Sequence, residues 1–213
     1  MGNYDRKDHL YKKAKEEGLR ARSSYKLEEL DKMFKLFRPG LIVLDLGCAP
    51  GGWIQVALRR LKGSGKVIGI DRLDVIAFSK SELQLCNSLE NPPVILKGDI
   101  TSDEVQQQVI NIAGRHVDLV LSDMSPDLSG VHFQDAARSA ELVEIAFDLA
   151  RKMLIPGGNV IAKIFPGPEA DQLFKEKKAS YKSLSRVELK SSRKTSKEFY
   201  LVGQGFIPRL EGN

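Results

Sequence analysis

Residues 41–53, LIVLDLGCAPGGW, decide the fold, because an unbroken apolar run passes directly into a glycine-rich turn. A continuous apolar run is typical of a strand in a parallel sheet that helices cover on both faces. Similar short runs follow at 67–70, 94–96, 117–121, 160–162 and 199–202. These runs predict the strands of one sheet.

Helical patterns flank and separate the apolar runs. Residues 132–153 place apolar side chains at three- and four-residue steps, and Pro156-Gly157-Gly158 follows as a terminating signal. Residues 23–36 predict a helix before the first strand, which Ser23 or Ser24 can cap. Strand and helix thus alternate, so the predicted fold is α/β and doubly wound.

Length and composition predict one domain spanning residues 1–213 and restrict its setting. Cys48 and Cys86 cannot build a disulfide framework, and with three histidines beside them no metal-ligand spacing is present, so no metal is predicted. Residues 1–8 hold acids and no apolar segment, and no run approaches the ~20 apolar residues of a membrane span. We expect a cytoplasmic protein without a membrane partner.

The charge is unevenly distributed along the chain. Residues 1–38 carry 11 basic and 7 acidic side chains, and residues 163–198 carry 10 and 5, whereas residues 39–162 carry 11 and 15. Two basic flanks on one face would attract a polyanion, with nucleic acid the foremost candidate. The charge alone leaves open that they are only two solvated helical faces.

Two common phosphate-binding motifs are not satisfied. The dinucleotide fingerprint G-x-G-x-x-G would require a glycine at Ala49, which argues against a nucleotide-dependent oxidoreductase. A phosphate loop at residues 63–66 would require glycine at Arg60 and a hydroxyl residue at Val67. The glycines at 63 and 65 are therefore interpreted as a turn.

Carboxylates follow the first three predicted strands, as Asp45, Asp71 and Asp99. Ligands of open α/β sheets bind at the carboxyl ends of the strands, where an acid can accept a hydrogen bond from a ribose diol. Three acids would repel a pyrophosphate and instead suit a nucleoside that carries an amine and a sugar diol. The alternative for Asp99, and less so for Asp71, is that it caps the next helix.

Five sequence motifs occur together in this chain. They are RARSSYKL at 20–27, DLGCAPGGW at 45–53, SDMSP at 122–126, AKIF at 162–165 and SSRKTSKE at 191–198. Together they resemble the FtsJ/RrmJ family of S-adenosylmethionine-dependent RNA ribose 2′-O-methyltransferases. The resemblance runs from about His9 to Gly203, and the combination is far more specific than any one motif. One departure is Cys48, where relatives often carry alanine or another small residue.

The resemblance implies a Rossmann-like class I methyltransferase fold, with a seven-stranded, mostly parallel sheet, an antiparallel last strand and helices on both faces. It implies a catalytic tetrad, with Lys163 nearest the reacting oxygen, and S-adenosylmethionine as the methyl donor, released as S-adenosylhomocysteine. The implied tetrad is Lys26, Asp123, Lys163 and Glu198. The predicted donor-binding residues are Asp45, Gly47, Pro50, Gly51, Gly52, Trp53, Asp71, Asp99, Ile100 and Asp123.

Basic side chains of both flanks are predicted to contact RNA phosphates, with the leader 1–38 packed on or near the RNA-binding face. Each of them taken alone is more often a solvated side chain, and Trp53 taken alone is as readily a core residue. The predicted RNA contacts are Arg20, Arg22, Lys32, Lys35, Arg38, Arg193, Lys194 and Lys197.

The chemistry of ribose methylation requires such residue types independently of the resemblance. A ribose hydroxyl is a weak acid, so the site needs a nearby base and an aligned donor. A lysine is a base only when neutral, which burial and a second ammonium group favour. That gives Lys26 a role beside Lys163, while Asp123 and Glu198 orient the pair.

Within the family, the chain looks most like the large-subunit ribosomal RNA branch, whose substrate is a uridine in the peptidyl-transferase region. We expect a monomer that acts on ribosomal RNA within the large subunit. A tRNA anticodon-loop enzyme is the nearest alternative and an mRNA cap enzyme a more distant one. A non-catalytic ribosome-assembly protein is a third, although all four tetrad positions hold the required residue types.

Overall fold

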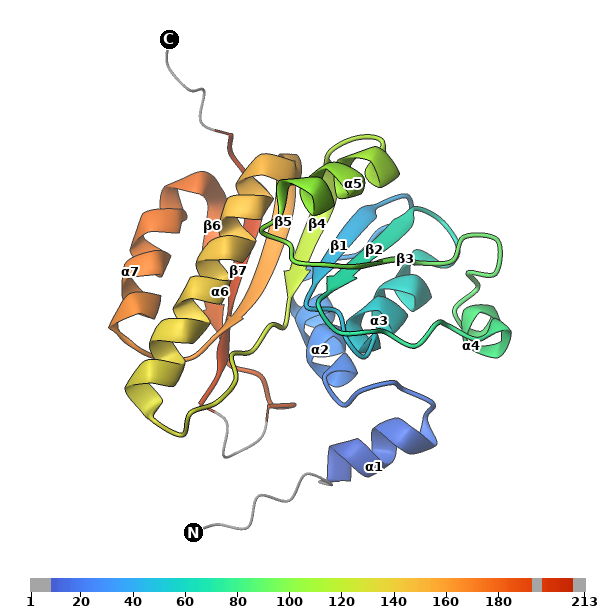
Figure 1. The fold of residues 1–213 in the computed structure, drawn as a ribbon, viewed down its shortest axis with the longest axis horizontal. Helices are drawn as coiled ribbons and strands as arrows, with labels where there is room; N and C mark the ends of the chain where they lie inside the picture. Colours follow the sequence, from blue (N-terminus) through green and yellow to red (C-terminus); the bar gives the residue numbers. More distant parts are fainter. Residues whose placement is uncertain (1–8, 193–196, 209–213) are drawn as a thin grey trace.

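The computed structural model, which describes residues 9–192 and 197–208, contains one seven-stranded sheet. The strand order is β3-β2-β1-β4-β5-β7-β6 (Figure 1), and β7 is antiparallel to both of its neighbours while all other pairs are parallel. The strands are β1 (Ile42–Leu46), β2 (Lys66–Asp71), β3 (Val94–Lys97), β4 (Val117–Ser122), β5 (Leu154–Ile164), β6 (Tyr181–Val187) and β7 (Phe199–Phe206). The predicted architecture, including the antiparallel last strand, is confirmed.

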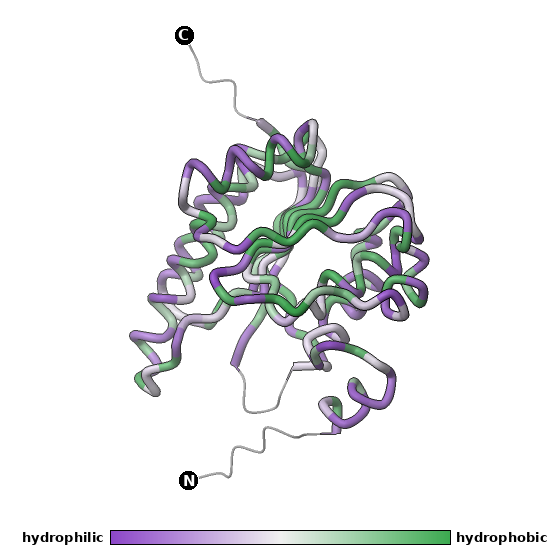
Figure 2. Tube along the Cα trace, turned by 45° about the vertical axis from the view of Figure 1, so that its right-hand side comes forward, coloured by the Kyte–Doolittle hydropathy of each residue, from purple (hydrophilic) through white to green (hydrophobic). Residues whose placement is uncertain are grey.

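Helices cover both faces of this sheet. One apolar cluster joins the sheet to α5, α6 and α7, and a second cluster joins its other face to α2, α3 and α4. The helices are α1 (His9–Glu16), α2 (Ser24–Phe34), α3 (Gly52–Leu61), α4 (Lys80–Leu85), α5 (Asp103–Ala113), α6 (His132–Met153) and α7 (Pro168–Lys177), with a 3-10 turn at Lys178–Ser180. Along the trace, the strands form the apolar centre, and polar residues concentrate on the outer helices (Figure 2).

The central strands are buried as the continuous apolar runs predict, whereas the edge strand β3 has no fully buried residue. All five residues of β1 and all six of β4 are buried. Because β1 lies between β2 and β4, the chain order reverses at this point of the sheet. Such a switch point opens a crevice at the carboxyl ends of the strands. The motif at 45–53 leads out of β1 at this edge.

Two parts of the fold differ from the residue pattern. Pro156-Gly157-Gly158 does follow the end of α6, but these residues lie inside β5 and not in a loop. The pattern of apolar runs does not predict strand β6, because its buried residues Tyr181, Leu184 and Val187 are three positions apart. A period of three resembles neither a buried nor an alternating strand.

Within the described residues, none of the helices combines the length and the apolarity that a membrane crossing requires.

Candidate active site

The turn after β1 forms the first part of the candidate site, and its shape requires glycine. Gly47 has φ +69°, and a β-carbon there would overlap the Met124 side chain. Gly51 has φ +101° and caps the start of α3. Backbone in this left-handed region is accessible to glycine at little cost. The turn thus places backbone atoms, without a covering side chain, at the carboxyl ends of the strands, where ligands bind in this type of fold.

Asp71 braces the turn from the end of β2. One of its carboxylate oxygens accepts the backbone N–H of Ala49 at 2.8 Å, and the other accepts that of Leu73 at 2.8 Å. Asp99, beyond β3, uses one oxygen to accept both the hydroxyl and the backbone N–H of Thr101, which lower the pKa of Asp99. Asp99 therefore forms a local turn with Thr101, while the N-cap of α5 is Ser102 and not Asp99.

Asp45 is buried to 1% exposure within β1, at the centre of this edge. Burial, with the charges of Asp123 and Asp71, raises the pKa of Asp45 well above its usual range. Its Oδ2 atom has no hydrogen-bond partner among the described residues. A buried polar atom without a partner is costly, and a hydrogen-bond donor such as an amine would satisfy this oxygen. The residues present therefore fit a ligand with an amine at this position.

Two buried ion pairs form the second part of the site. Lys163 of β5 lies with its Nζ atom 3.3 Å from Oδ1 of Asp123 and donates to the Asp123 carbonyl at 2.7 Å. Lys26 of α2 forms the other pair with Glu198, just before β7. Lys26, Lys163 and Glu198 are between 7% and 9% exposed. Lysines are rarely buried unless paired, so these two are positioned side chains and not surface charges.

Tyr200 connects the two pairs, and the sequence analysis missed it. Its hydroxyl donates to Oδ1 of Asp123 at 2.8 Å, and the Nζ atom of Lys26 lies 5.9 Å from the centre of its fully buried ring. Tyr200 is the register partner of Lys163 in the antiparallel β5–β7 pair. The available signal was the spacing of Glu198 and Tyr200, since residues two apart in a strand face the same side.

The charge of Glu198 is stabilised inside the site. Burial opposes its ionisation, but the ammonium group of Lys26, a hydrogen bond from Ser192 and the charge of Lys163 hold the pKa of Glu198 at about 2. The carboxylate is therefore ionised at neutral pH and can orient Lys26.

The two basic flanks meet beside the ion pairs. Glu29 of α2 accepts the backbone N–H groups of Lys190 and Ser191, and Arg22 donates to the Ser191 carbonyl at 2.7 Å. Lys190 and Lys197 are exposed on this side. Two of the predicted RNA contacts, Arg193 and Lys194, lie outside the described residues.

Arg20 is a correction to the predicted RNA contacts. Its guanidinium group forms an ion pair with Glu82 at 2.7 Å and donates to three backbone carbonyls, so its side chain is only 10% exposed. A guanidinium group with this many internal partners is not presented to a phosphate.

Three further predicted RNA contacts lie at or just beyond the end of α2. Lys32 lies in its last turn and Lys35 forms its C-cap, while Arg38 approaches Asp118 at 3.9 Å. Asp118 is at the start of β4, about 16 Å along the strand from Asp123. Arg38 therefore belongs to the opposite edge of the sheet, because α2 carries its C-terminal end away from Lys26.

The remaining predicted donor residues divide between turn and core. Trp53 is 3% exposed, donates from its indole nitrogen to the Ser23 carbonyl and packs 6.0 Å from the Tyr200 ring. This is the core role that the sequence left open for Trp53. Ile100 packs in the core of the α5 side. Pro50 lies in the turn and Gly52 begins α3, and their carbonyls accept from Arg20 and Ser24.

The FtsJ-like methyltransferase family model matches residues 19–206, and the chain belongs to this family. The ribosomal RNA large subunit methyltransferase E of Legionella pneumophila (strain Corby) is 44% identical over 201 residues, which are 93% of this chain and 92% of that protein. The protein of the same name from Methanobrevibacter smithii is 40% identical over 202 residues, 95% of this chain and 91% of that protein. The protein is thus a methyltransferase, as its fold and site indicate.

A solved structure extends the similarity to three dimensions. A crystal structure of a Plasmodium falciparum protein, described as a ribosomal RNA methyltransferase, matches with a TM-score of 0.76 at 28% identity. The match covers 89% of this chain and 100% of that chain.

Proposed function

We propose that this protein transfers a methyl group from S-adenosylmethionine to the 2′-hydroxyl of a ribose in large-subunit ribosomal RNA, with a uridine as the target. The observation that carries the proposal is the pair of buried lysine–carboxylate ion pairs at the edge that also holds the glycine turn and the carboxylates. The names of the two curated relatives support ribosomal RNA as the substrate class.

The donor is assigned to the β1–β3 half of the site. Asp45 would pair with its amine, Asp71 and Asp99 would accept hydrogen bonds from its hydroxyl and base groups, and the turn at 47–52 would contact it through backbone. When bound, the donor supplies an electrophilic methyl group on a sulfonium centre. The residues of the turn align that group with the acceptor side.

The acceptor is assigned to the ion pairs. Lys163, once its ammonium group has lost a proton to solvent, would accept the proton of the 2′-hydroxyl with its neutral amine as the oxygen attacks, which makes the oxygen a competent nucleophile. Asp123 holds the Lys163 ammonium product by the contacts already present, and Tyr200 fixes Asp123. Lys26, paired with Glu198, would place its positive charge near the oxygen that develops negative charge.

The RNA is assigned to the face where α2 and the segment around Lys190 meet. Exposed Lys190 and Lys197 border the ion pairs there, and Arg193 and Lys194 fall between them in sequence. Phosphate contacts from such side chains position an RNA without reading its sequence. The contacts of Arg22 and Glu29 with the segment at Lys190 and Ser191 support a leader that belongs to the same domain as the site.

The decisive experiment is ribose-methylation mapping by mass spectrometry on RNA from cells that lack this protein. Loss of one 2′-O-methyl mark in large-subunit RNA is expected, and purified protein with labelled donor should restore it on isolated large subunits. Methyl transfer to tRNA instead would show that tRNA, and not ribosomal RNA, is the substrate. Absence of any transfer, with RNA binding retained, would favour the non-catalytic ribosome-assembly alternative.

A further inference from the structure

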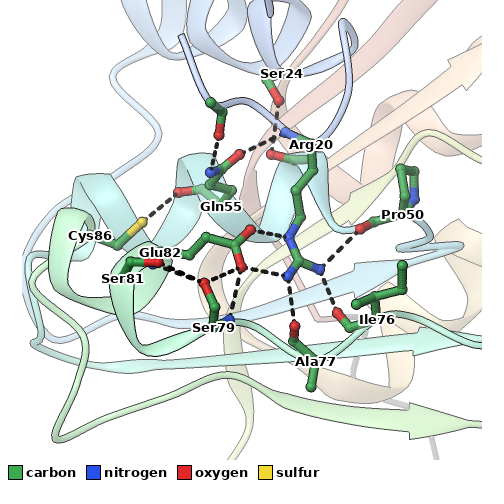
Figure 3. Close-up of polar contacts among 12 residues, drawn as sticks. Arg20, Ser24, Pro50, Gln55, Ile76, Ala77, Ser79, Ser81, Glu82 and Cys86 are labelled. Atoms are coloured by element: carbon green, nitrogen blue, oxygen red, sulfur yellow. Dashed lines mark hydrogen bonds and ion pairs between the residues drawn. The ribbon is translucent and has the colours of Figure 1, made fainter. Parts of the chain in front are cut away.

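Arg20 forms a clamp between the leader and the loops around the glycine turn (Figure 3). Its Nε and Nη2 atoms donate to the two oxygens of Glu82 at 2.7 and 3.0 Å. The same group donates to the carbonyls of Pro50 at 3.3 Å, Ile76 at 2.6 Å and Ala77 at 3.0 Å. One side chain thus joins three segments that are 30 to 62 residues away from it in sequence.

The clamp lies directly against the glycine turn. The Arg20 guanidinium carbon is 3.5 Å from the centre of the Phe78 ring, so the two groups are stacked. A β-carbon on Gly51 would lie 3.2 Å from Arg20 atoms and 3.2 Å from Phe78. The stacked pair therefore limits where the Gly51 backbone can lie.

The carboxylate end of the clamp is itself fixed. Glu82 and Ser79 form a capping box at the start of α4, in which each side chain accepts a backbone N–H of the other residue. Hydrogen bonds from Arg20 hold the pKa of Glu82 at about 2. The segment after β2 thus has a rigid anchor for the guanidinium group.

The backbone next to Arg20 is bonded to the same region. The Arg20 N–H donates to the side chain of Gln55 in α3, and that side chain donates back to the Gly18 carbonyl. The Ser24 hydroxyl donates to the Gly52 carbonyl at 3.1 Å. Two residues later the same chain places Lys26 in its ion pair. The glycine turn and Lys26 are therefore positioned by one continuous stretch.

We propose that Arg20 is a positioning residue of the donor site, which holds the turn at 47–52 and the segment at 76–78 in their donor-binding arrangement. The inference rests on the proposed function only in that the donor binds at this turn. It assigns Arg20 to the donor side, whereas its place in a basic leader had suggested a phosphate contact.

The test is Arg20→Lys, which keeps the charge but lacks the planar fork that makes five directed hydrogen bonds. We expect the S-adenosylmethionine Kd, measured by calorimetry, and the donor KM to rise about 10-fold. At saturating donor, kcat should stay within about 2-fold, and the salt dependence of RNA affinity should not change. Glu82→Gln removes the charged partner at the other end and should raise the donor KM in the same direction.

Arg186→Lys is the matched control. Arg186 also bonds a carboxylate, Asp171 at 2.5 Å, and lies 4.5 Å from a phenylalanine ring, but it connects β6 with α7. Its substitution should leave the donor KM unchanged, even if it lowers the melting temperature as much as Arg20→Lys does. An equal rise in donor KM for the control would mean that Arg20 contributes only to the general stability of the fold.

Three results would contradict these proposals, and they can be told apart. An unchanged donor Kd and KM in Arg20→Lys, or in Glu82→Gln if Arg20→Lys does not fold, would overturn the positioning role. A loss of roughly 0.7–0.9 from the log–log salt slope of RNA binding, in an Arg20→Ala variant that binds donor normally, would restore the phosphate contact. Wild-type protein that binds no S-adenosylmethionine would instead refute the proposed function.

Discussion

The two halves of the site are built in different ways. The donor half, at the ends of β1 to β3, consists of a turn whose backbone is held by glycines and by the Asp71 carboxylate. The acceptor half consists of buried side chains from α2, β5, the end of β4 and the start of β7. A turn tolerates solvent and local adjustment, whereas buried charges depend on every partner. Removing one partner of a buried pair leaves an uncompensated charge, which costs about 3–5 kcal/mol.

The largest expected effect is at Lys163. In Lys163→Arg, guanidinium stays protonated and cannot accept the 2′-hydroxyl proton, so single-turnover methyl transfer at neutral pH should fall by roughly 10²–10⁴-fold. Donor affinity by calorimetry should change less than about 2-fold, because Lys163 belongs to the acceptor half. Lys177→Arg, at an ion pair with Asp148 elsewhere in the fold, is the control. Substantial activity in Lys163→Arg would assign the proton to Asp123 or to water.

Tyr200→Phe should have the next largest effect. It removes the hydroxyl that donates to Asp123 but keeps the ring that packs against Trp53. A lost hydrogen bond to a charged group of about 1.5 kcal/mol corresponds to roughly a 10-fold lower kcat. The donor KM should not change. Tyr181→Phe, at another buried tyrosine, is the control. Equal losses in the two variants would show that Tyr200 acts only through packing.

The donor half should respond in smaller steps, and Asp71 should matter more than Asp99. Asp71→Ala frees the Ala49 N–H and so loosens the turn itself, whereas Asp99→Ala frees only Thr101. Each lost contact of about 0.5–1.5 kcal/mol weakens donor binding by roughly 2- to 10-fold in calorimetry. Unchanged affinity in both variants contradicts the assignment of this edge to the donor.

Charge removal at the RNA face should have a weaker effect still. Lys197→Ala should lower the log–log salt slope of RNA binding by roughly 0.7–0.9, because one phosphate contact releases its counterions. Arg38→Ala, at the opposite edge of the sheet, should leave the slope unchanged. Filter binding at several salt concentrations measures both. A lower slope in Arg38→Ala alone would place the RNA on the other edge.

The same contrast explains what the sequence could predict. The turn at 45–53 and the carboxylates that follow β2 and β3 were found because strand, glycine and acid are neighbours in the chain. The tetrad residues lie 172 positions apart from first to last, from Lys26 to Glu198, so only the family motifs pointed to them. Tyr200 was missed because its spacing from Glu198 indicates a shared side of the strand but does not show the hydrogen bond to Asp123.

The internal role of Arg20 and the position of Arg38 could not be predicted for the same reason. The net charge of a segment does not show which guanidinium groups form hydrogen bonds and ion pairs inside the fold. Arg20 forms an ion pair with Glu82 and hydrogen bonds with three backbone carbonyls. Arg38 lies at the opposite edge of the sheet because of the direction of α2. The two basic flanks do come together in the fold, because Glu29 of α2 accepts the backbone N–H groups of Lys190 and Ser191.

The smallest expected effect concerns the ion pair between Arg20 and Glu82, which is partly exposed to solvent. The pKa of Glu82 falls from 4.5 to about 2 on folding, chiefly through Arg20, so its ionised form stabilises the protein above pH 4.5. That contribution should be lost progressively as the pH falls from about 4.5 to about 2. Since the Glu82 side chain is 26% exposed, we expect only about 0.5–1 kcal/mol. Urea unfolding of wild type and Glu82→Gln should therefore differ by this amount at pH 7 and converge toward pH 2.5. A difference that is independent of pH would mean that Glu82 stabilises α4 through its capping box alone, and the Arg20 ion pair would then contribute nothing to stability.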